Sequence, residues 1–216
     1  MRRETEDWAQ SHARLLHAQA IEAVRGQQLQ ADAWWTALGQ GHVETVRAAL
    51  EAAFADNPAP VTICELEPTS AFLAVVLPDS DVLPARRAHV TPGGRLSVKD
   101  WTQTDLNETY ADLLGAHLLA TARETWAVAP ALQTFRVVGL LDSDDESRVL
   151  FYFQVDRDGT PWQSDSTGRR ILDNAPYGLN RVGRTRQVAP WREDQLPPSL
   201  YATLDQHHLI PRQTHG

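Results

Sequence analysis

The chain has 216 residues, a formal net charge of −8 and 42% hydrophobic residues, enough apolar material for a substantial core. This acidic balance argues against a protein that coats nucleic acid over its whole surface, although a local basic patch stays compatible with it. Cys64 is the only cysteine, which excludes an intramolecular disulfide, and no apolar run reaches the length of a membrane span. We therefore expect a cytoplasmic globular protein that makes no membrane contact.

Helical spacing of apolar residues dominates the first part of the chain, so we assign residues 1–58 to an N-terminal helical segment. The pattern predicts one helix over 5–24, weakened at its end by Gly26, a second over 32–38 and a third over 42–54. Trp34 and Trp35 are neighbours on the second helix, so their side chains point about 100° apart and cannot both face one core. Either they contact a protein partner or a second copy of the chain, or one lies flat on its own domain.

The next segment, 59–165, is predicted to be an α+β core. Residues 61–66 and 71–77 are rich in strand-forming residues and are separated by a turn, which indicates a β-hairpin. Residues 86–90 and 96–98 are candidates for short strands on either side of a Pro-Gly-Gly turn. After the long helix described next, an acidic turn at 142–147 leads to a returning strand at 149–155.

Residues 101–142 form the clearest organised segment, one long amphipathic helix followed by an apolar strand. One helical face carries residues spaced three and four apart, namely Leu106, Tyr110, Leu113, Leu114, His117, Leu118 and Thr121. Thr102 or Thr104 can cap the helix start, and Pro130 stops it. The run 132–141 is suited to a buried strand. We expect the remaining strands to pack against this helix, with His117 as a buried core histidine.

From residue 160 onward prolines and glycines interrupt every periodic pattern, apart from a short helix expected over about 196–208. Residues 166–216 are therefore assigned to an irregular, arginine-rich C-terminal segment. Helices come first, then a hairpin, a long helix and a second hairpin. This order favours an α+β fold with N-terminal helices and a mainly antiparallel sheet packed on one long central helix.

Four of these segments together resemble a region that precedes the nuclease domain in some Mrr-type restriction endonuclease-like bacterial proteins. The matching residues are 72–78, 86–90, 110–126 and 135–141, which cover less than a third of the chain. In that family the chemistry lies in a separate domain with an acidic residue ahead of a Glu-x-Lys or Gln-x-Lys pair. Here Lys99 follows Ser97 and Val98, so the acid is missing. The resemblance implies a stand-alone module without nuclease activity.

Clusters of acidic residues were weighed as catalytic or metal sites. Glu65 and Glu67 could share one strand face, and Asp156 and Asp158 precede Gly159 as in a fragment of a calcium loop. The third group is an acidic run made of Asp142, Asp144, Asp145 and Glu146. A solvent-facing strand edge explains the first group better than a reactive site does, and hairpin turns explain the other two better.

The other common reactive or metal-binding patterns are absent from the sequence. The eight histidines lack the spacing of a zinc site, and Cys64 lies in an apolar strand, where packing is its usual role. We predict no catalytic residues, no metal and no cofactor. A metal-dependent hydrolase using Glu65, Glu67, Asp142 or Asp156 remains the alternative.

Residues 167–192 have a distinct electrostatic character, because basic side chains outnumber acidic ones and aromatic rings lie between them. Arginines with interleaved aromatic side chains are typical of surfaces that bind phosphates or single strands. The candidate contacts for nucleic acid or another anion are Arg169, Arg170, Arg181, Arg184, Arg186, Arg192, Tyr177 and Trp191. The alternative is that these arginines pair with acidic residues of the same chain.

The preferred reading is therefore a non-catalytic binding or accessory module that contacts a protein or a nucleic acid. A third hypothesis is a structural assembly subunit, a homo-oligomer held together through its N-terminal helices.

Overall fold

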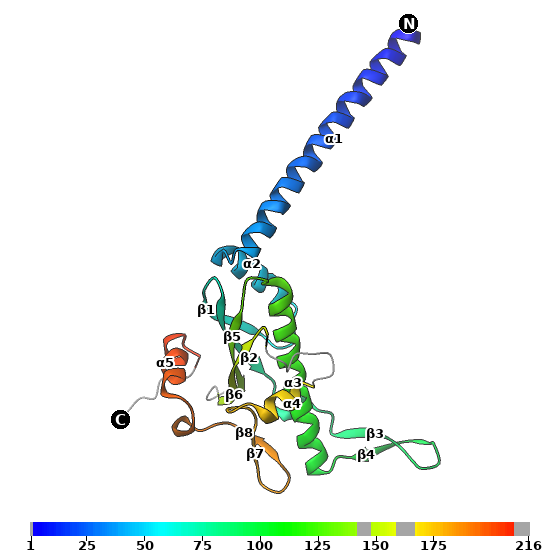
Figure 1. Cartoon of the computed structure of the whole chain (residues 1–216). Helices are drawn as coiled ribbons and strands as arrows, with labels where there is room; N and C mark the ends of the chain where they lie inside the picture. Colours follow the sequence, from blue (N-terminus) through cyan, green and yellow to red (C-terminus); the bar gives the residue numbers. More distant parts are fainter. Residues whose placement is uncertain (1, 142–147, 159–166, 210–216) are drawn as a thin grey trace.

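The chain begins with one continuous helix, α1 (Arg2–Gly39), in the computed structural model, which describes residues 2–141, 148–158 and 167–209. The prediction of two separate helices here is wrong. Gly26 lies inside α1, because one glycine costs a helix only about 1 kcal/mol relative to alanine and good helix formers surround it. At 1.5 Å per residue α1 is roughly 57 Å long, and it projects from the rest of the molecule (Figure 1).

The second helix, α2 (Val43–Phe54), matches the predicted third helix and turns the chain onto the body of the molecule. Gly41 makes the turn between α1 and α2 possible, since its φ is +71° and a Cβ there would overlap the carbonyl oxygen of Pro68. The buried face of α2 carries Val46, Leu50 and Phe54. Leu38 at the end of α1 is also fully buried and anchors that helix to the core.

Four strands form the main sheet in the order β1-β2-β5-β6. They are β1 (Val61–Leu66), β2 (Ser70–Leu77), β5 (Thr134–Leu141) and β6 (Arg148–Asp156). The two outer pairings are antiparallel hairpins and the central pairing of β2 with β5 is parallel. The α+β fold with a mainly antiparallel sheet is therefore confirmed. The parallel centre follows from the long helix between β2 and β5, since parallel neighbours need a crossover connection.

That crossover is α3 (Gln103–Val128), the predicted central helix. Its first turn is capped by the Thr102 hydroxyl, which accepts a hydrogen bond from the backbone N–H of Asp105 at 3.1 Å. At the other end Arg157 donates hydrogen bonds to the carbonyls of Leu132 at 2.8 Å and Ala129 at 3.0 Å. A cation at this position also suits the negative end of the helix dipole.

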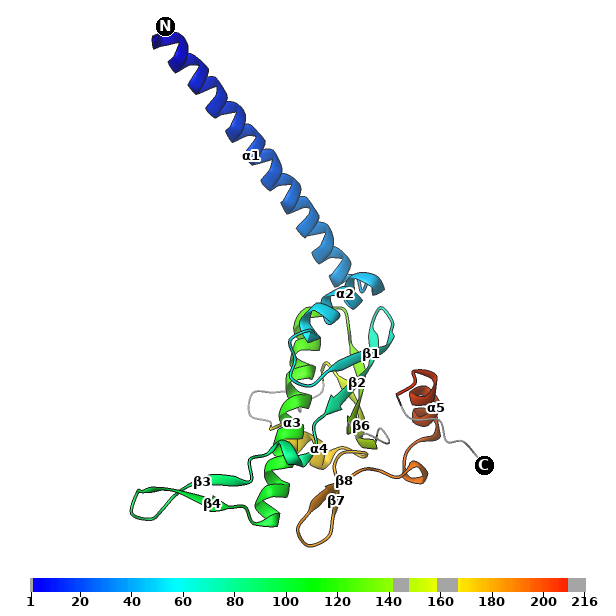
Figure 2. The same cartoon turned by 180° about the vertical axis from the view of Figure 1, so that it is seen from behind.

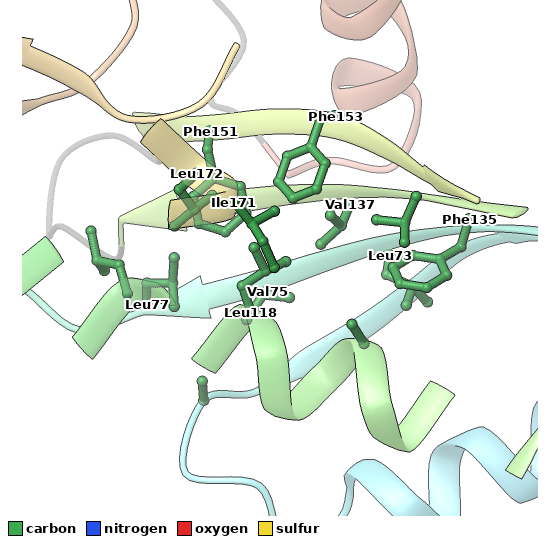
Figure 3. Packing of buried hydrophobic residues seen from close by; sticks show 14 of the residues in the cluster. Leu73, Val75, Leu77, Leu118, Phe135, Val137, Phe151, Phe153, Ile171 and Leu172 are labelled. Atoms are coloured by element: carbon green, nitrogen blue, oxygen red, sulfur yellow. The ribbon is translucent and has the colours of Figure 1, made fainter. Parts of the chain in front are cut away.

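Both faces of the sheet are covered. On one face α2, α3 and α4 (Gly168–Asn174) pack over the larger core, in which Leu118 lies against residues of β2 and β5 such as Leu73 and Val137 (Figure 3). On the other face Phe72, Val138 and Val149 pack against Leu200 and Leu204 of α5 (Pro198–Gln206). A sheet buried on both sides explains why β2 and β5 are continuous apolar runs rather than alternating ones.

The C-terminal segment contains more regular structure than the sequence pattern predicts. It includes α4 (Gly168–Asn174), β7 (Asn180–Val182), β8 (Gln187–Ala189) and a 3-10 turn, η3 (Glu193–Gln195). The predicted helix over 196–208 corresponds to α5. The predicted acidic turn at 142–147 lies outside the described residues.

A second, two-stranded sheet formed by β3 (Arg86–Val90) and β4 (Leu96–Asp100) follows a 3-10 turn, η1 (Ser80–Val82). The expectation that all strands pack against α3 is wrong here, because this β3–β4 ribbon projects from the body (Figure 2). Its base is held by Arg87, which pairs with Asp105 at 2.5 Å and lies 4.9 Å from the Trp101 ring centroid. Among the described residues, no helix combines the length and apolarity needed to cross a membrane.

The contact between α3 and α4 yields a prediction about stability. A Cβ on Gly115 would overlap the backbone of Gly168 and Arg169. We expect Gly115→Ala to lower the free energy of unfolding by about 1–3 kcal/mol, although alanine is the better helix former. Urea unfolding followed by fluorescence measures it. Gly26→Ala is the matched control, since nothing lies within 4 Å of its Cβ, and equal stability of the two variants would contradict the prediction.

Candidate functional site

Three of the predicted arginines converge on one carboxylate of α3. Glu108 pairs with Arg169 at 3.0 Å, with Arg186 at 3.6 Å and, through a short contact, with Arg181. Arg181 is the most buried of them, with 8% of its side chain exposed. These arginines come from α4, β7 and the turn before β8, so Glu108 joins three parts of the C-terminal segment to the central helix.

Two more carboxylates surround the same arginines. Arg169 lies 3.3 Å from Asp112 and 3.7 Å from Asp173, and Arg186 lies 3.9 Å from Asp173. The group therefore contains three arginines and three acidic residues, and its charges compensate each other. These three arginines therefore pair with acidic residues of the same chain, which is the alternative that the sequence left open.

The other three predicted arginines differ. Arg192 pairs with the neighbouring Asp194 at 2.5 Å, and both side chains are more than half exposed. Their mutual hydrogen bond raises the pKa of Arg192 and lowers that of Asp194. Arg170 and Arg184 are exposed and have no ion pair with another described residue. Contact of these side chains with nucleic acid remains a prediction.

Tyr177 and Trp191 have structural contacts on the sheet. The carbonyl of Tyr177 accepts a 2.7 Å hydrogen bond from the N–H of Tyr152, and Trp191 donates its backbone N–H to Val149 at 2.7 Å. The Trp191 indole N–H is directed to the carbonyl of Gly178 at 2.8 Å. Both rings pack on the smaller core. Each aromatic residue therefore helps to attach the C-terminal segment along the β6 edge.

The described acidic candidates are distributed over separate partners. Glu65 pairs with Arg136 of β5, Glu67 accepts a hydrogen bond from Ser70 at 2.8 Å, and Asp156 accepts one from Gln154 at 3.0 Å. Asp142, Asp144, Asp145 and Glu146 lie outside the described residues. Within the described ranges, no group of three or more histidine, cysteine or acidic residues is arranged to hold a metal ion.

Cys64 lies half-buried in β1, and burial together with the nearby Glu65 carboxylate raises the pKa of its thiol to about 11. A nucleophilic cysteine needs a lowered pKa, so this environment suits packing rather than catalysis. His117 is half-buried on α3, and burial lowers the pKa of its imidazole. Its partial exposure differs from the fully buried position expected from the sequence.

Exposed apolar side chains are concentrated on α1. Every side chain from 12 to 36 is exposed. Trp34 is 42% exposed and Trp35 59% exposed, with their rings edge to face at 5.0 Å, and Trp8 is stacked on His12 at 5.1 Å. The other large apolar residues exposed on α1 are Leu15, Leu16, Ile21, Val24 and Leu29. The sequence indicated the tryptophan pair but not that the helix around it stands free.

The β3–β4 ribbon is a second exposed apolar surface. Val90 pairs with Leu96 and Ala88 with Val98, so all four side chains lie on one face of the ribbon. Leu96 is 81% exposed. The sequence signal is the alternation of apolar residues in 86–98, but alternation alone does not say whether the apolar face is covered.

Comparisons with models of protein families, with curated proteins and with solved structures find no match, so the inference of function depends on the residues of this chain.

The Glu108 cluster gives a testable difference between buried and exposed ion pairs. We expect Glu108→Gln to destabilise the fold by about 2–3 kcal/mol, because it leaves the nearly buried Arg181 without its carboxylate. Asp194→Asn is the control with the same chemical change at an exposed pair, and its effect on stability should be much smaller. Thermal and urea unfolding measure both, and equal losses would contradict the assignment.

The Cys64 thiol offers a test by chemical modification. Its pKa is raised from 9.0 to about 11, so at pH 8 the thiolate population should be lower by on the order of a hundredfold. Iodoacetamide should therefore alkylate the folded protein slowly, with a rate that keeps rising beyond pH 9. The urea-unfolded chain is the control and should react at the ordinary rate, whereas equal rates for both states would refute the raised pKa.

Proposed function

We propose that this chain is a non-catalytic, cytoplasmic protein-binding module whose docking element is α1. The observation that carries the proposal is the exposure of every side chain from 12 to 36 of α1, including Trp34 and Trp35. The resemblance to the region ahead of Mrr-type nuclease domains, which implies a stand-alone module, is compatible with this role.

A helix that packs against nothing along most of its length is expected to be only marginally stable in water. Most helical stability in proteins comes from packing of an apolar face, and isolated helices gain little from backbone hydrogen bonds in water. Among the side chains of α1 whose burial is described, Leu38 at its end is the only buried one. Tryptophan is also the residue most enriched among those that dominate binding energies at protein interfaces. These facts support a partner that covers α1.

The β3–β4 ribbon supports the same function independently. A lone two-stranded hairpin is marginally stable in water, and this one leaves Val90, Leu96 and Val98 exposed on one face. Surfaces of this type mark protein contacts.

The two alternatives have weaker support among the described residues. Nucleic-acid binding would depend on Arg170, Arg184 and Arg192, since the other three predicted arginines are paired with acidic residues around Glu108. Of the residues named for the hydrolase alternative, Glu65 and Asp156 belong to opposite edge strands of the sheet, and Asp142 lies outside the described residues. The assembly hypothesis uses the same surface of α1 and is one form of the protein-binding function.

The proposal is tested by binding of the full chain to proteins in a lysate of its own cells, together with its self-association when purified. Replacing both Trp34 and Trp35 by alanine should weaken the bound complex by at least about thirtyfold, as expected for loss of interface tryptophans. Thr36→Ala, on the same helix, is the control and should bind like the wild type. The proposal is overturned if the wild-type chain binds no protein that the double variant does not also bind, and if the purified wild-type chain does not self-associate.

A further inference from the structure

One side of α1 forms a continuous apolar face. At 100° per residue, the side chains within a sector of about 100° are Ala13, Leu16, His17, Ala20, Val24, Gln27, Ala31, Trp34 and Trp35. His17 and Gln27 are its polar members, and none of the nine carries a fixed charge. We refer to this set as the apolar stripe, and every member is exposed.

The charged residues of α1 between 12 and 36 lie on the other side. They are Arg14, Glu22, Arg25 and Asp32, and they fall in a sector of about 80° whose centre is roughly 150° from that of the apolar stripe. A helix with one uncharged face and one charged face, in contact with its own body only at its end, is built to pair with another helix.

The order of these charges along α1 is complementary to that of a second copy of α1 running in the opposite direction. Along the chain they alternate as basic, acidic, basic and acidic, so the same helix read in reverse presents the complementary order. Arg14 and Asp32 have their midpoint at residue 23, and Glu22 and Arg25 have theirs beside it. A second copy that runs antiparallel, with its two-fold axis at this midpoint, therefore puts opposite charges level with each other.

Of the four charged residues, Arg14 and Asp32 lie nearest the apolar stripe, about 60° beyond its edge, whereas Glu22 and Arg25 point farther away from it. Arg14 and Asp32 are eighteen residues apart, which is five full turns, so they lie on the same flank. A two-fold axis puts this flank of both copies on the same side of the helix pair, so each Arg14 lies nearly level with Asp32 of the second copy at the border of the interface. In a parallel, unstaggered pair each of these residues would be level with its own copy, which places like charges together.

The apolar stripe fits the same register by size. With the midpoint between residues 23 and 24, Leu16 lies level with Ala31 of the second copy, and Trp34 lies level with Ala13. Each large side chain thus meets an alanine across the interface, which lets the two helices approach closely. Ala20 is level with Gln27, and Val24 lies next to the axis.

We propose that α1 pairs antiparallel with α1 of a second copy of this chain, centred near residue 23; this rests on the proposed function of α1 as a docking element. The two bodies then lie at opposite ends of the helix pair, each with its β3–β4 ribbon directed outward.

Sedimentation equilibrium of the purified full chain tests the pairing with matched substitutions. Ala20 belongs to the apolar stripe, and Ala18 lies about 200° away on the charged side. Ala20→Glu should weaken the dimer by on the order of a hundredfold, because two carboxylates enter the apolar contact. Ala18→Glu adds the same charge to the same helix and should leave the dimer intact. Circular dichroism checks that both variants remain folded.

Charge reversal tests the orientation. In a dimer of the Arg14→Glu variant, each new glutamate lies level with Asp32 of the other copy. In a dimer of the Asp32→Arg variant, each new arginine lies level with Arg14 of the other copy. Because both dimers then hold like charges, each variant should self-associate about tenfold more weakly. An equimolar mixture of the two variants restores both opposite-charge pairs and should form a mixed dimer as tight as the wild type. In a parallel, unstaggered dimer each single variant would only exchange one like-charge pair for another, so the two orientations are told apart by whether the single variants associate more weakly than the wild type.

The outcomes separate this inference from the proposed function. Weaker association of both single variants, together with recovery in the mixture, supports the antiparallel pair. A dimer that is insensitive to Ala20→Glu, or that shows no recovery, overturns the proposed interface. A monomeric wild-type chain overturns self-pairing, yet leaves the proposed function standing if the tryptophan pair still binds another protein. Failure of both experiments would falsify the two together.

Discussion

The parallel pairing of β2 with β5 is the constraint on which the rest of the body depends. Two hairpins can join edge to edge in this sense only if the chain between them returns to the starting end of the sheet. The 26-residue α3 makes that return and buries one face of the sheet. Tyr110 attaches the helix to the end of β2 by donating its hydroxyl to the carbonyl of Pro78 at 2.9 Å. The position of α4 and of the charged cluster around Glu108 follows from where α3 lies.

A sheet with a single helical layer would leave its second face in water, and the C-terminal segment supplies the missing cover. Leu196, Leu200 and Leu204 provide the apolar contact, while Tyr177 and Trp191 join the segment to β6 by backbone hydrogen bonds. Arginines of this segment also hold it against the body of the protein. Arg169, Arg181 and Arg186 attach it to α3 through Glu108, so the basic character of 167–192 is largely used within the fold.

Local patterns predicted the body of the protein well because burial there is periodic. The run from Leu106 to Thr121 specifies one buried helical face, and 61–66, 71–77 and 132–141 predict three strands of the sheet in nearly their observed positions. What the sequence did not reveal depends on long-range contacts. Glu108 lies 73 residues before Arg181 in the chain, so no local pattern links them. Likewise, the spacing in α1 is that of a helix whether or not something covers it, and only the structure places Trp34 and Trp35 in solvent.

The main sheet is open and has two edge strands, β1 and β6, whose outer edges are protected in different ways. The outer edge of β6 is occupied by Tyr177 and Trp191, whereas β1 is the other edge strand. The register shift between Ile63 and Glu65 breaks the regular spacing of hydrogen-bonding groups along β1, and Pro60 and Pro68 lie just beyond its ends. Prolines, bulges and charged side chains are the devices by which natural proteins prevent amyloid-like growth on an edge strand. Together these features of β1 disfavour the addition of a stray strand at this edge of the sheet.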